Sequence, residues 1–253
     1  MLIDLSGRTA LVTGAGRSVG RGIAEVLAKG GAFVYVNDLH ADRADEVAAA
    51  IEAKGGSARA LPFDVTDAGA VERGFAAVES DDSTIDILVN NAGIAEGAMA
   101  PTLFSESGPE DWQPTVDLNL YGSMHLIRSC LPPMIEQRFG RIIQISSGAG
   151  STGLGIGVSA YGAAKAAAES LIRHVAVENG KHGITANALA LGLMANVGGT
   201  VNEGVLRLLR GVPVGRLGEP EEVGLAAAWL ASDGGGFVTG QVIHLNGGST
   251  FGR

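Results

Sequence analysis

The stretch Arg8-Thr-Ala-Leu-Val-Thr13-Gly14-Ala-Gly16-Arg-Ser18-Val-Gly20 decides the fold of this chain. It begins as an apolar run typical of a buried strand, passes through a glycine-rich turn, and leads into residues 21–29, which have helical periodicity. At such a junction backbone N–H groups point outward and the helix dipole adds partial positive charge, so an anion can bind. Glycines also let a pyrophosphate approach the backbone closely. A tight turn that needs positive φ is the alternative interpretation.

A carboxylate follows the next apolar run, residues 32–37. Asp38 would stand at the tip of the second strand of a βαβ unit, where it can accept both ribose hydroxyls of an adenosine. As an alternative, Asp38 is a solvated acid that opens a loop, but the glycine-rich turn would then have to be a coincidence as well. Together the two features predict a dinucleotide site.

A tyrosine and a lysine stand four residues apart in Ser159-Ala-Tyr161-Gly-Ala-Ala-Lys165. The alanine-rich segment 160–178 lacks proline and predicts a helix, on which the two side chains share one face. The ammonium favours the phenolate, so we expect the pKa of Tyr161 to be lowered from its usual value of about 10. Such a tyrosine can exchange a proton while a carbonyl and an alcohol interconvert. A chance surface pair is the alternative for this motif alone.

Strand and helix signals alternate along the whole chain, which predicts an α/β fold. We expect a doubly wound parallel sheet of about seven strands with helices on both faces and ligands at the carboxyl ends of the strands. The predicted strands are residues 9–13, 33–37, 57–62, 85–90, 141–146, 184–191 and 241–245. The predicted helices are residues 18–29, 42–54, 68–79, 111–135, 160–178, 201–209 and 220–232.

Several polar residues follow these strands. Asp64 could reach an adenine amino group or serve as a helix N-cap. The sequence Asn90-Asn91-Ala92-Gly93 could pack beside a cofactor ribose and hold adjoining strands together, or form a simple turn. Asn119 falls inside a predicted helix, where it suggests a local kink with a purpose. Ser147 could hydrogen-bond a substrate oxygen, or be an ordinary serine at a strand end.

Composition bounds the function. At 253 residues the chain suits one dinucleotide-binding and catalytic domain over residues 1–253. The net charge of −9 argues against nucleic acid and against an anionic membrane surface. The single Cys130, the absence of a signal-peptide pattern and the lack of a membrane-spanning run predict a cytoplasmic protein. We expect no metal site.

These motifs resemble the short-chain dehydrogenase/reductase family over nearly the whole chain. The resemblance implies a single-domain Rossmann-type fold and a catalytic tetrad of Asn119, Ser147, Tyr161 and Lys165. Tyr161 would be the general acid/base and Ser147 would orient the substrate oxygen, while Lys165 would lower the pKa of Tyr161 and bind the nicotinamide ribose. Asn119 would hold a water that links Lys165 to solvent. The implied cofactor contacts come from Gly14, Arg17, Ser18, Val19, Asp38, Asp64, Val65, Asn91, Ala92, Gly93, Tyr161, Lys165 and Gly192.

Three positions depart from the family pattern. Ser18 replaces a glycine beside the phosphates, so the binding geometry there could shift. Leu191 replaces the proline before Gly192, and Asn196 replaces a threonine that normally helps to cradle the carboxamide. The segment 148–159 is one residue longer than expected, which would enlarge the loop on the substrate side.

The leading functional prediction is an NAD-dependent alcohol dehydrogenase or carbonyl reductase acting on an apolar secondary alcohol or ketone. Asp38 would repel the 2′-phosphate of NADP, whereas Arg17 could pair with it. One alternative is an NADPH-dependent 3-oxoacyl-thioester reductase, for which Arg138 would be one docking residue for a carrier protein, although His182 occupies the place of the other. Another is a catalytically inactive nucleotide-binding scaffold, which the complete tetrad argues against.

Two further predictions concern larger parts of the chain. Residues 193–214 read as an amphipathic substrate lid, or as a helix that merely packs on the core. The resemblance also implies a homotetramer, in which helices 111–135 and 160–178 build one two-fold interface and strand 241–245 contributes to another.

Overall fold

The fold is built around one parallel β-sheet. The computed structural model describes residues 3–94, 102–195 and 203–250. Within them, seven strands run in the order β3-β2-β1-β4-β5-β6-β7, and every neighbouring pair is parallel. This arrangement confirms the predicted doubly wound sheet. The strands are β1 (Thr9–Val12), β2 (Phe33–Val36), β3 (Ser57–Ala60), β4 (Ile87–Asn90), β5 (Gly140–Ser147), β6 (Ile184–Leu191) and β7 (Val242–Leu245).

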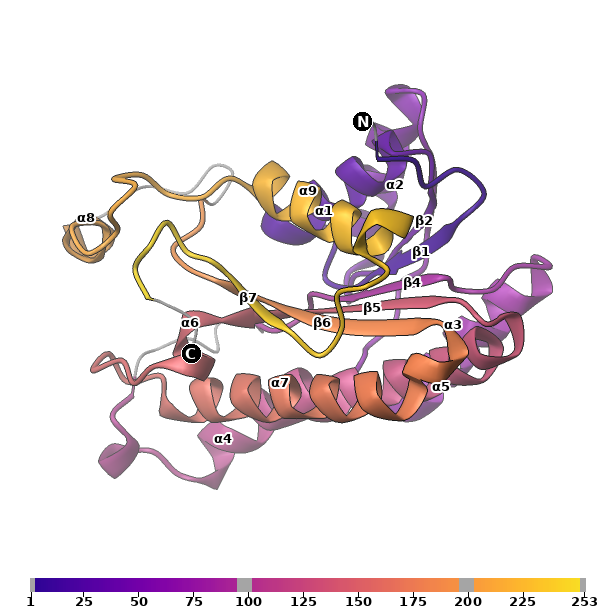
Figure 1. Cartoon of the computed structure of the whole chain (residues 1–253). Coiled ribbons are helices and arrows are strands. Elements are labelled where there is room, and N and C mark those ends of the chain that lie inside the picture. Colours follow the sequence, from indigo (N-terminus) through magenta and orange to yellow (C-terminus); the bar gives the residue numbers. More distant parts are fainter. Residues whose placement is uncertain (1–2, 95–101, 196–202, 251–253) are drawn as a thin grey trace.

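Helices cover both faces of the sheet (Figure 1). The layer with α1, α2 and α9 lies on one side, and α3, α5 and α7 lie on the other, with α4 beside α7. The α-helices of the described residues are α1 (Ser18–Lys29), α2 (Ala41–Ala53), α3 (Ala68–Ser80), α4 (Pro109–Val116), α5 (Gly122–Gln137), α6 (Gly148–Ser151), α7 (Ser159–Asn179), α8 (Glu203–Leu209) and α9 (Pro220–Ala231).

The central strands contribute side chains to two separate cores, because successive side chains point to opposite faces of a sheet. On β1, Ala10 and Val12 pack toward α1, α2 and α9, whereas Leu11 packs toward α3, α5 and α7. Central strands buried on both faces explain the continuous apolar runs in the sequence.

The predicted helix 111–135 is interrupted. After α4 the chain forms a five-residue π-helix, Asp117–Tyr121, before α5 begins at Gly122. The Nδ2 atom of Asn119 donates a 2.9 Å hydrogen bond to the Thr115 carbonyl, and the Ser123 hydroxyl donates to the Asn119 carbonyl. A π-helical turn of this kind is frequent at functional sites. It confirms the kink predicted at Asn119, while the single continuous helix was wrong.

Other differences are small. β5 reaches Ser147, one residue beyond the predicted end, and leads into the short helix α6, which the sequence did not predict. The predicted helix 201–209 and the predicted lid 193–214 lie partly outside the described residues, and α8 is the helix observed there.

Candidate active site

The glycine-rich turn joins β1 to α1. Gly14 has a φ of +59°, in the left-handed region that favours glycine. A Cβ atom on Gly16 would lie 2.6 Å from the Asp38 Oδ2 atom, and one on Gly20 would lie 2.2 Å from the Gly14 carbonyl oxygen. All three positions therefore require glycine, and the turn presents backbone rather than side chains to whatever binds there.

Ser18 adopts a strained backbone conformation in the glycine-rich turn. Its φ is +46°, again in the left-handed region, although it is not glycine. It is the first residue of α1, after an extended Arg17 that makes no side-chain cap, and the next residue, Val19, packs against the core. The turn thus accommodates the serine at some cost in backbone strain.

Asp38 ties the second strand to this turn. Its side chain is buried, with Oδ2 accepting from the Gly16 N–H at 3.0 Å and Oδ1 accepting from the His40 N–H at 3.1 Å. A Cβ atom added to Gly16 would also lie 2.6 Å from the Cβ atom of Arg43 on α2. The sequence analysis missed Arg43, although its place in the first turn of the helix after Asp38 could have indicated it.

Asp64 does not cap a helix, which corrects one of its two predicted roles. The N-cap of α3 is Asp67, whose Oδ1 accepts from the N–H groups of Gly69 and Ala70. Asp64 Oδ1 accepts instead from the N–H and the hydroxyl of Thr66, both at 2.8 Å. The neighbouring Val65 is buried and packs near α5. The proposed adenine contact of Asp64 stays a prediction.

The asparagines after β4 hold the central strands together, as expected. Asn91 Nδ2 donates to the carbonyls of Thr13 and Gly14 at 2.9 and 3.0 Å. The N–H groups of Asn91 and Ala92 both donate to the Thr13 hydroxyl. This stretch is therefore more than a simple turn, because the Asn91 side chain links the end of β4 to the glycine-rich turn.

Gly93 stands where two of the predicted catalytic groups, Lys165 and Asn119, converge. A Cβ atom on Gly93 would lie 2.7 Å from Lys165 Nζ and 2.8 Å from Asn119 Oδ1. Asn119 Nδ2 donates a 3.0 Å hydrogen bond to the Gly93 carbonyl, and its Oδ1 is buried without a partner among the described residues. An unpaired buried amide oxygen beside an ammonium is a suitable acceptor for a bound water.

Ser147 and Tyr161 meet on the neighbouring side of the same site. Ser147 ends β5 and its hydroxyl caps α6, accepting from the Ala149 N–H at 3.2 Å. The Ser147 side chain lowers the pKa of the nearby Tyr161 hydroxyl, against the raising by burial. Lys165 Nζ lies 5.6 Å from the centre of the Tyr161 ring and donates a 2.7 Å bond to the Ile145 carbonyl. The structure thus brings the four predicted catalytic residues together.

The direction of the pKa shift at Tyr161 is opposite to the one expected. Burial raises the pKa of Tyr161 above its ordinary value, and the side chain of Ser147 opposes this shift. Burial also lowers the pKa of Lys165 to about 8, against the opposing charge of Glu169. The ammonium was expected to dominate, but Lys165 is buried and Tyr161 is partly buried, and desolvation disfavours the charged form of each.

Gly192 follows β6 and is needed for close packing. Its N–H donates to the Leu245 carbonyl at 2.9 Å, and a Cβ atom there would lie 2.7 Å from the Asn246 Cα atom. Leu191 is buried, and Asn196 lies outside the described residues. The cofactor contact expected of Gly192 stays a prediction.

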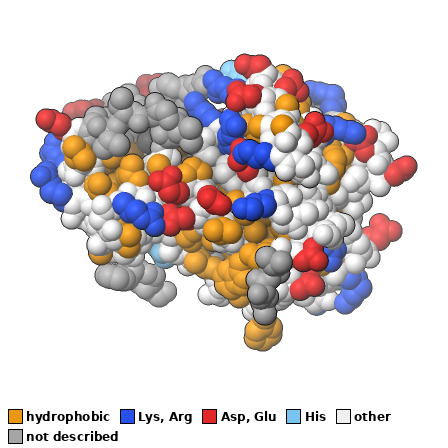
Figure 2. Space-filling model, turned by 90° about the horizontal axis from the view of Figure 1, so that it is seen from above, with side chains coloured by type: hydrophobic (Ala, Val, Ile, Leu, Met, Phe, Trp, Pro, Cys, Tyr) orange, Lys and Arg blue, Asp and Glu red, His pale blue; other side chains and the backbone are white. Residues whose placement is uncertain are grey.

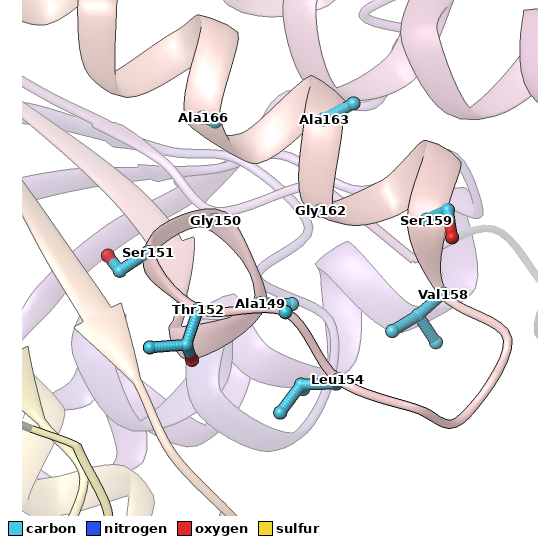
Figure 3. Close-up of a pocket in the computed structure, with 11 residues that line it drawn as sticks. Ala149, Gly150, Ser151, Thr152, Leu154, Val158, Ser159, Gly162, Ala163 and Ala166 are labelled. Atoms are coloured by element: carbon cyan, nitrogen blue, oxygen red, sulfur yellow. The ribbon is translucent and has the colours of Figure 1, made fainter.

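A cavity of about 360 Å³ opens between α6 and α7 (Figure 3). Ala149, Leu154, Val158, Ala163 and Ala166 are among its lining residues. Ala163 and Ala166 stand on another face of α7 from Tyr161 and Lys165, given 3.6 residues per turn. This cavity is therefore separate from the catalytic groups.

Known proteins resemble this chain over nearly its whole length. The family model described as enoyl-(acyl carrier protein) reductase matches residues 14–250. The chain is 39% identical over 246 residues to the 3-oxoacyl-[acyl-carrier-protein] reductase FabG of Haemophilus influenzae, covering 96% of this chain and 98% of that protein. It is 40% identical over 247 residues to the acetoacetyl-CoA reductase of Rhizobium meliloti, covering 96% and 99%.

Solved structures show the same fold. A 3-oxoacyl-[acyl-carrier protein] reductase from Brucella melitensis with bound NAD has a TM-score of 0.88 at 33% identity, covering 97% of this chain and 92% of that one. A putative gluconate dehydrogenase from Agrobacterium tumefaciens has a TM-score of 0.92 at 32% identity, covering 98% of both chains.

Fold and comparisons together define an oxidoreductase of the class that binds a nicotinamide cofactor on a doubly wound sheet. The chain belongs to the short-chain dehydrogenase/reductase family.

The described residues contain neither a metal-binding cluster nor a membrane-spanning helix. Within residues 3–94, 102–195 and 203–250, no group of three or more His, Cys, Asp or Glu side chains is arranged to hold a metal ion. In the same part of the chain, no helix has both the length and the apolar character required to cross a membrane.

Proposed function

We propose that this protein reduces the 3-oxo group of acyl thioesters to a 3-hydroxyl group with a reduced nicotinamide cofactor. The observation that carries the proposal is the close, nearly full-length similarity to two reductases whose names specify such substrates. This substrate class was the alternative in the sequence analysis, and it now takes the place of a simple secondary alcohol or ketone. Retention of all four tetrad residues supports an active enzyme over a scaffold.

The arrangement of side chains suits this reaction. A reduced nicotinamide held near Gly93, Asn119 and Lys165 would supply the hydride for C3 of the substrate, and the carbon–oxygen π electrons would pass to the oxygen. The Tyr161 hydroxyl gives its proton to the resulting oxygen, and the Ser147 hydroxyl hydrogen-bonds the same oxygen as negative charge develops there. Burial favours the protonated form of Tyr161, which is the form that a reduction consumes.

The surface beside the tetrad suits an acyl chain. Ile94, directly after Gly93, is 54% exposed, and Ile156, in the segment after Ser147, is 42% exposed. The Thr102 N–H donates to the Gly157 carbonyl at 3.1 Å, which brings the exposed Leu103 and Phe104 to the same segment. Exposed apolar side chains gathered near a site commonly mark a binding surface for an apolar ligand.

Three observations support a nicotinamide dinucleotide at this edge of the sheet. The glycine-rich turn keeps side chains away from the N-terminus of α1, where a pyrophosphate is favoured. Asp38 lies beside that turn, at the place expected for the adenosine ribose. The buried Asn119 Oδ1 and Lys165 Nζ converge near Gly93, where the nicotinamide ribose would lie.

For the cofactor we retain NADH, because the buried carboxylate of Asp38 would repel a 2′-phosphate. Arg17 and Arg43 are the nearby cations that could pair with such a phosphate and make NADPH the second candidate. The ratio of kcat/KM for the two cofactors tests this assignment, and a clear NADPH preference would overturn it. Asp38→Asn should move the ratio toward NADPH.

The substrate proposal is tested by following cofactor oxidation with matched substrates. We expect 3-oxoacyl thioesters to be reduced with a higher kcat/KM than simple ketones of the same chain length. Acetoacetyl-CoA and longer thioesters, a 2-enoyl thioester, a secondary ketone and a sugar-acid ketone form a suitable panel. A preference for the ketone, the sugar acid or the enoyl thioester would each replace the proposed substrate.

We further infer that residues 1–253 act as one catalytic domain, that residues 193–214 close over the substrate, and that the enzyme works in the cytoplasm. The exposed Leu206 and Leu208 on α8 support the lid, since they offer apolar surface without a partner in the described core. Limited proteolysis within 193–214, with and without cofactor and substrate, tests the lid, and an unchanged cleavage rate would argue against closure.

A further inference from the structure

A buried carboxylate that the proposed reaction does not use lies one helical turn beyond Lys165. Glu169 on α7 is 5% exposed, and its Oε1 atom accepts a 2.6 Å hydrogen bond from the Ser146 hydroxyl, which is also buried. That length is typical of a hydroxyl bonded to a carboxylate. Fully buried glutamates are rare because desolvation is costly, so this one calls for a specific role.

Glu169 takes part in a regular pairing between β5 and α7. Two consecutive residues of β5 each bind one side chain of the helix, the Ile145 carbonyl binding Lys165 and the Ser146 hydroxyl binding Glu169. The next residue, Ser147, lies near enough to Tyr161 to lower its pKa. Tyr161, Lys165 and Glu169 are spaced four residues apart and share one face of α7. Any shift of Ser146 along the helix would therefore displace Ser147 and Ile145 as well.

The short helix α6 covers this pair of charges. A Cβ atom on Gly150 would lie 3.0 Å from Glu169 Oε1 and 3.3 Å from the Lys165 Cβ atom. A Cβ atom on Gly162 of α7 would lie 2.6 Å from the Ala149 carbonyl, so both glycines permit the close approach seen in Figure 3. With water excluded, the attraction between Glu169 and Lys165 is stronger than it would be at the surface.

Other charges near Lys165 are few. The described parts of β6 and α6 carry no titratable side chain, and β5 carries only Arg141, at its far end. The acids of α4 and the π-helix lie toward the surface: Asp111 binds the Gly108 N–H, Asp117 binds Gln113, and Glu110 is exposed. Among the described residues, Glu169 is the only charged group found to act on the pKa of Lys165, which it raises against the lowering by burial.

We propose that Glu169 is a positioning residue with two effects on the tetrad. Through Ser146 it fixes the end of β5 against α7, and its negative charge keeps Lys165 an ammonium at the place where the cofactor ribose binds. The proposal rests on the role of Lys165 in the proposed function, and it is independent of which carbonyl compound is reduced.

The test separates charge from shape. Glu169→Gln keeps the length of the side chain and an oxygen that can accept from Ser146, but it removes the charge. Glu178→Gln, at an exposed position on the same helix, is the matched control. The affinity for NADH and NADPH is measured by cofactor fluorescence across pH, together with the pH profile of kcat. Thermal unfolding confirms that each variant is folded.

With the charge removed, Lys165 should lose its proton at lower pH. We expect the pH at which cofactor affinity falls to move down by about one unit in Glu169→Gln, which corresponds to about fivefold weaker binding at pH 8. Glu178→Gln should keep the wild-type profile. If Glu169→Gln keeps it as well, the charge has no role and the proposal is overturned.

Two more variants protect this test against misfolding. Glu169→Met removes the charge with an apolar side chain of similar length, and its profile should move in the same direction. Ser146→Ala keeps the charge but removes the tether, so kcat should fall several-fold while the affinity profile stays in place. An unmoved profile in folded Glu169→Met, or an unchanged kcat in Ser146→Ala, would contradict the corresponding half of the proposal.

Failure of the proposed function would look different. If the wild-type enzyme reduces no 3-oxoacyl thioester, the substrate assignment fails, yet the effect of Glu169 on cofactor affinity still decides the present proposal.

Discussion

Burial decides in which protonation state the Tyr161 side chain works. Because burial raises its pKa, Tyr161 stays a phenol through neutral pH and is ready to donate a proton. Reduction needs this phenol, whereas oxidation of the alcohol needs the phenolate. We therefore expect kcat for reduction to hold through neutral pH and fall at alkaline pH, while kcat for oxidation rises. Steady-state rates in both directions across this range check the assignment; oxidation that is fastest at neutral pH would contradict it.

Tyr161 and Lys165 should respond differently to substitution. Tyr161→Phe removes the proton donor and little of the expected cofactor contact, so we expect kcat to drop by about 10²–10⁴-fold with cofactor affinity nearly intact. Lys165→Ala should lower both, since that ammonium is assigned two roles. Single-turnover rates and fluorescence titrations with cofactor measure the two effects separately. A Tyr161→Phe enzyme that kept most of its kcat would rule out the general acid/base role.

Gly93 offers a further test of the geometry at this scale. Gly93→Ala would place a methyl group 2.7 Å from Lys165 Nζ and 2.8 Å from Asn119 Oδ1, closer than real contacts allow. We expect activity to fall by at least about tenfold through displacement of these groups. Gly180→Ala is the control, because a Cβ atom there meets no described atom within 4 Å. Equal activities in the two variants would show that the convergence at Gly93 is not needed.

At the scale of elements, α9 is held at its start by a short charged network. Glu222 accepts from the Glu219 N–H at 2.8 Å and binds Arg216 with both oxygens. The bond to Arg216 is the largest cause that lowers the pKa of Glu222 to about 2. α9 packs closely on α1, where a Cβ atom on Gly22 would lie 2.5 Å from the Pro220 Cβ atom. The start of α9 therefore packs against α1, the helix that follows the glycine-rich turn.

This network should stabilise the fold in a pH-dependent manner. The folded pKa of Glu222 lies below its unfolded value of 4.5, so its contribution is complete above pH 4.5 and is lost as pH falls toward about 2. Glu222→Gln should lower the free energy of unfolding by less than about 1 kcal/mol at neutral pH. The effect is small because Arg216 and Glu222 are both about half exposed, and solvent screens their charges. Thermal unfolding of both proteins at pH 7 and near pH 2 checks this. A difference in Tm that persists undiminished at the lower pH would exclude the charge as its cause.

At the scale of the whole molecule, large apolar side chains remain uncovered. Val177 on α7 is 85% exposed and Phe237 is fully exposed. Seen from above the layer with α1 and α9, hydrophobic side chains gather between dispersed charges (Figure 2). The small Ala163 and Ala166 stand on the same outer face of α7 as Val177. Apolar surface of this kind commonly marks an interface between protein chains.

We accordingly expect a homotetramer, in which α7 and α5 build one two-fold contact and β7 contributes to another. Light scattering at micromolar concentration should show a tetramer, or at least a dimer. Val177→Asp should reduce the mass of the assembly, while Ala49→Asp, at an exposed position on α2, should leave it unchanged. A clean monomer for the wild-type protein would remove the hypothesis.

The sequence by itself determined the features that depend on short spacings. The alternation of predicted strands and helices along the chain predicted the doubly wound sheet. Each element could be predicted because the spacing of its apolar residues depends only on the local sequence. The glycines at 14, 16 and 20 predicted a tight turn. In the structure, close contacts at 16 and 20 and the positive φ at 14 require glycine. Tyr161 and Lys165 were found by their spacing on one helix, and Ser147 by its place at a strand end.

Only the tertiary structure decided what surrounds these residues. Ser146 and Glu169 are far apart in the sequence, and their 2.6 Å bond depends on how β5 packs against α7. The upward shift of the pKa of Tyr161 depends on the elements that seal it from water. A distant contact also joins the π-helix to the end of β4, where Asn119 Nδ2 donates to the Gly93 carbonyl. Spacing along a chain specifies local conformation, whereas burial and charge environment depend on which distant segments cover a residue.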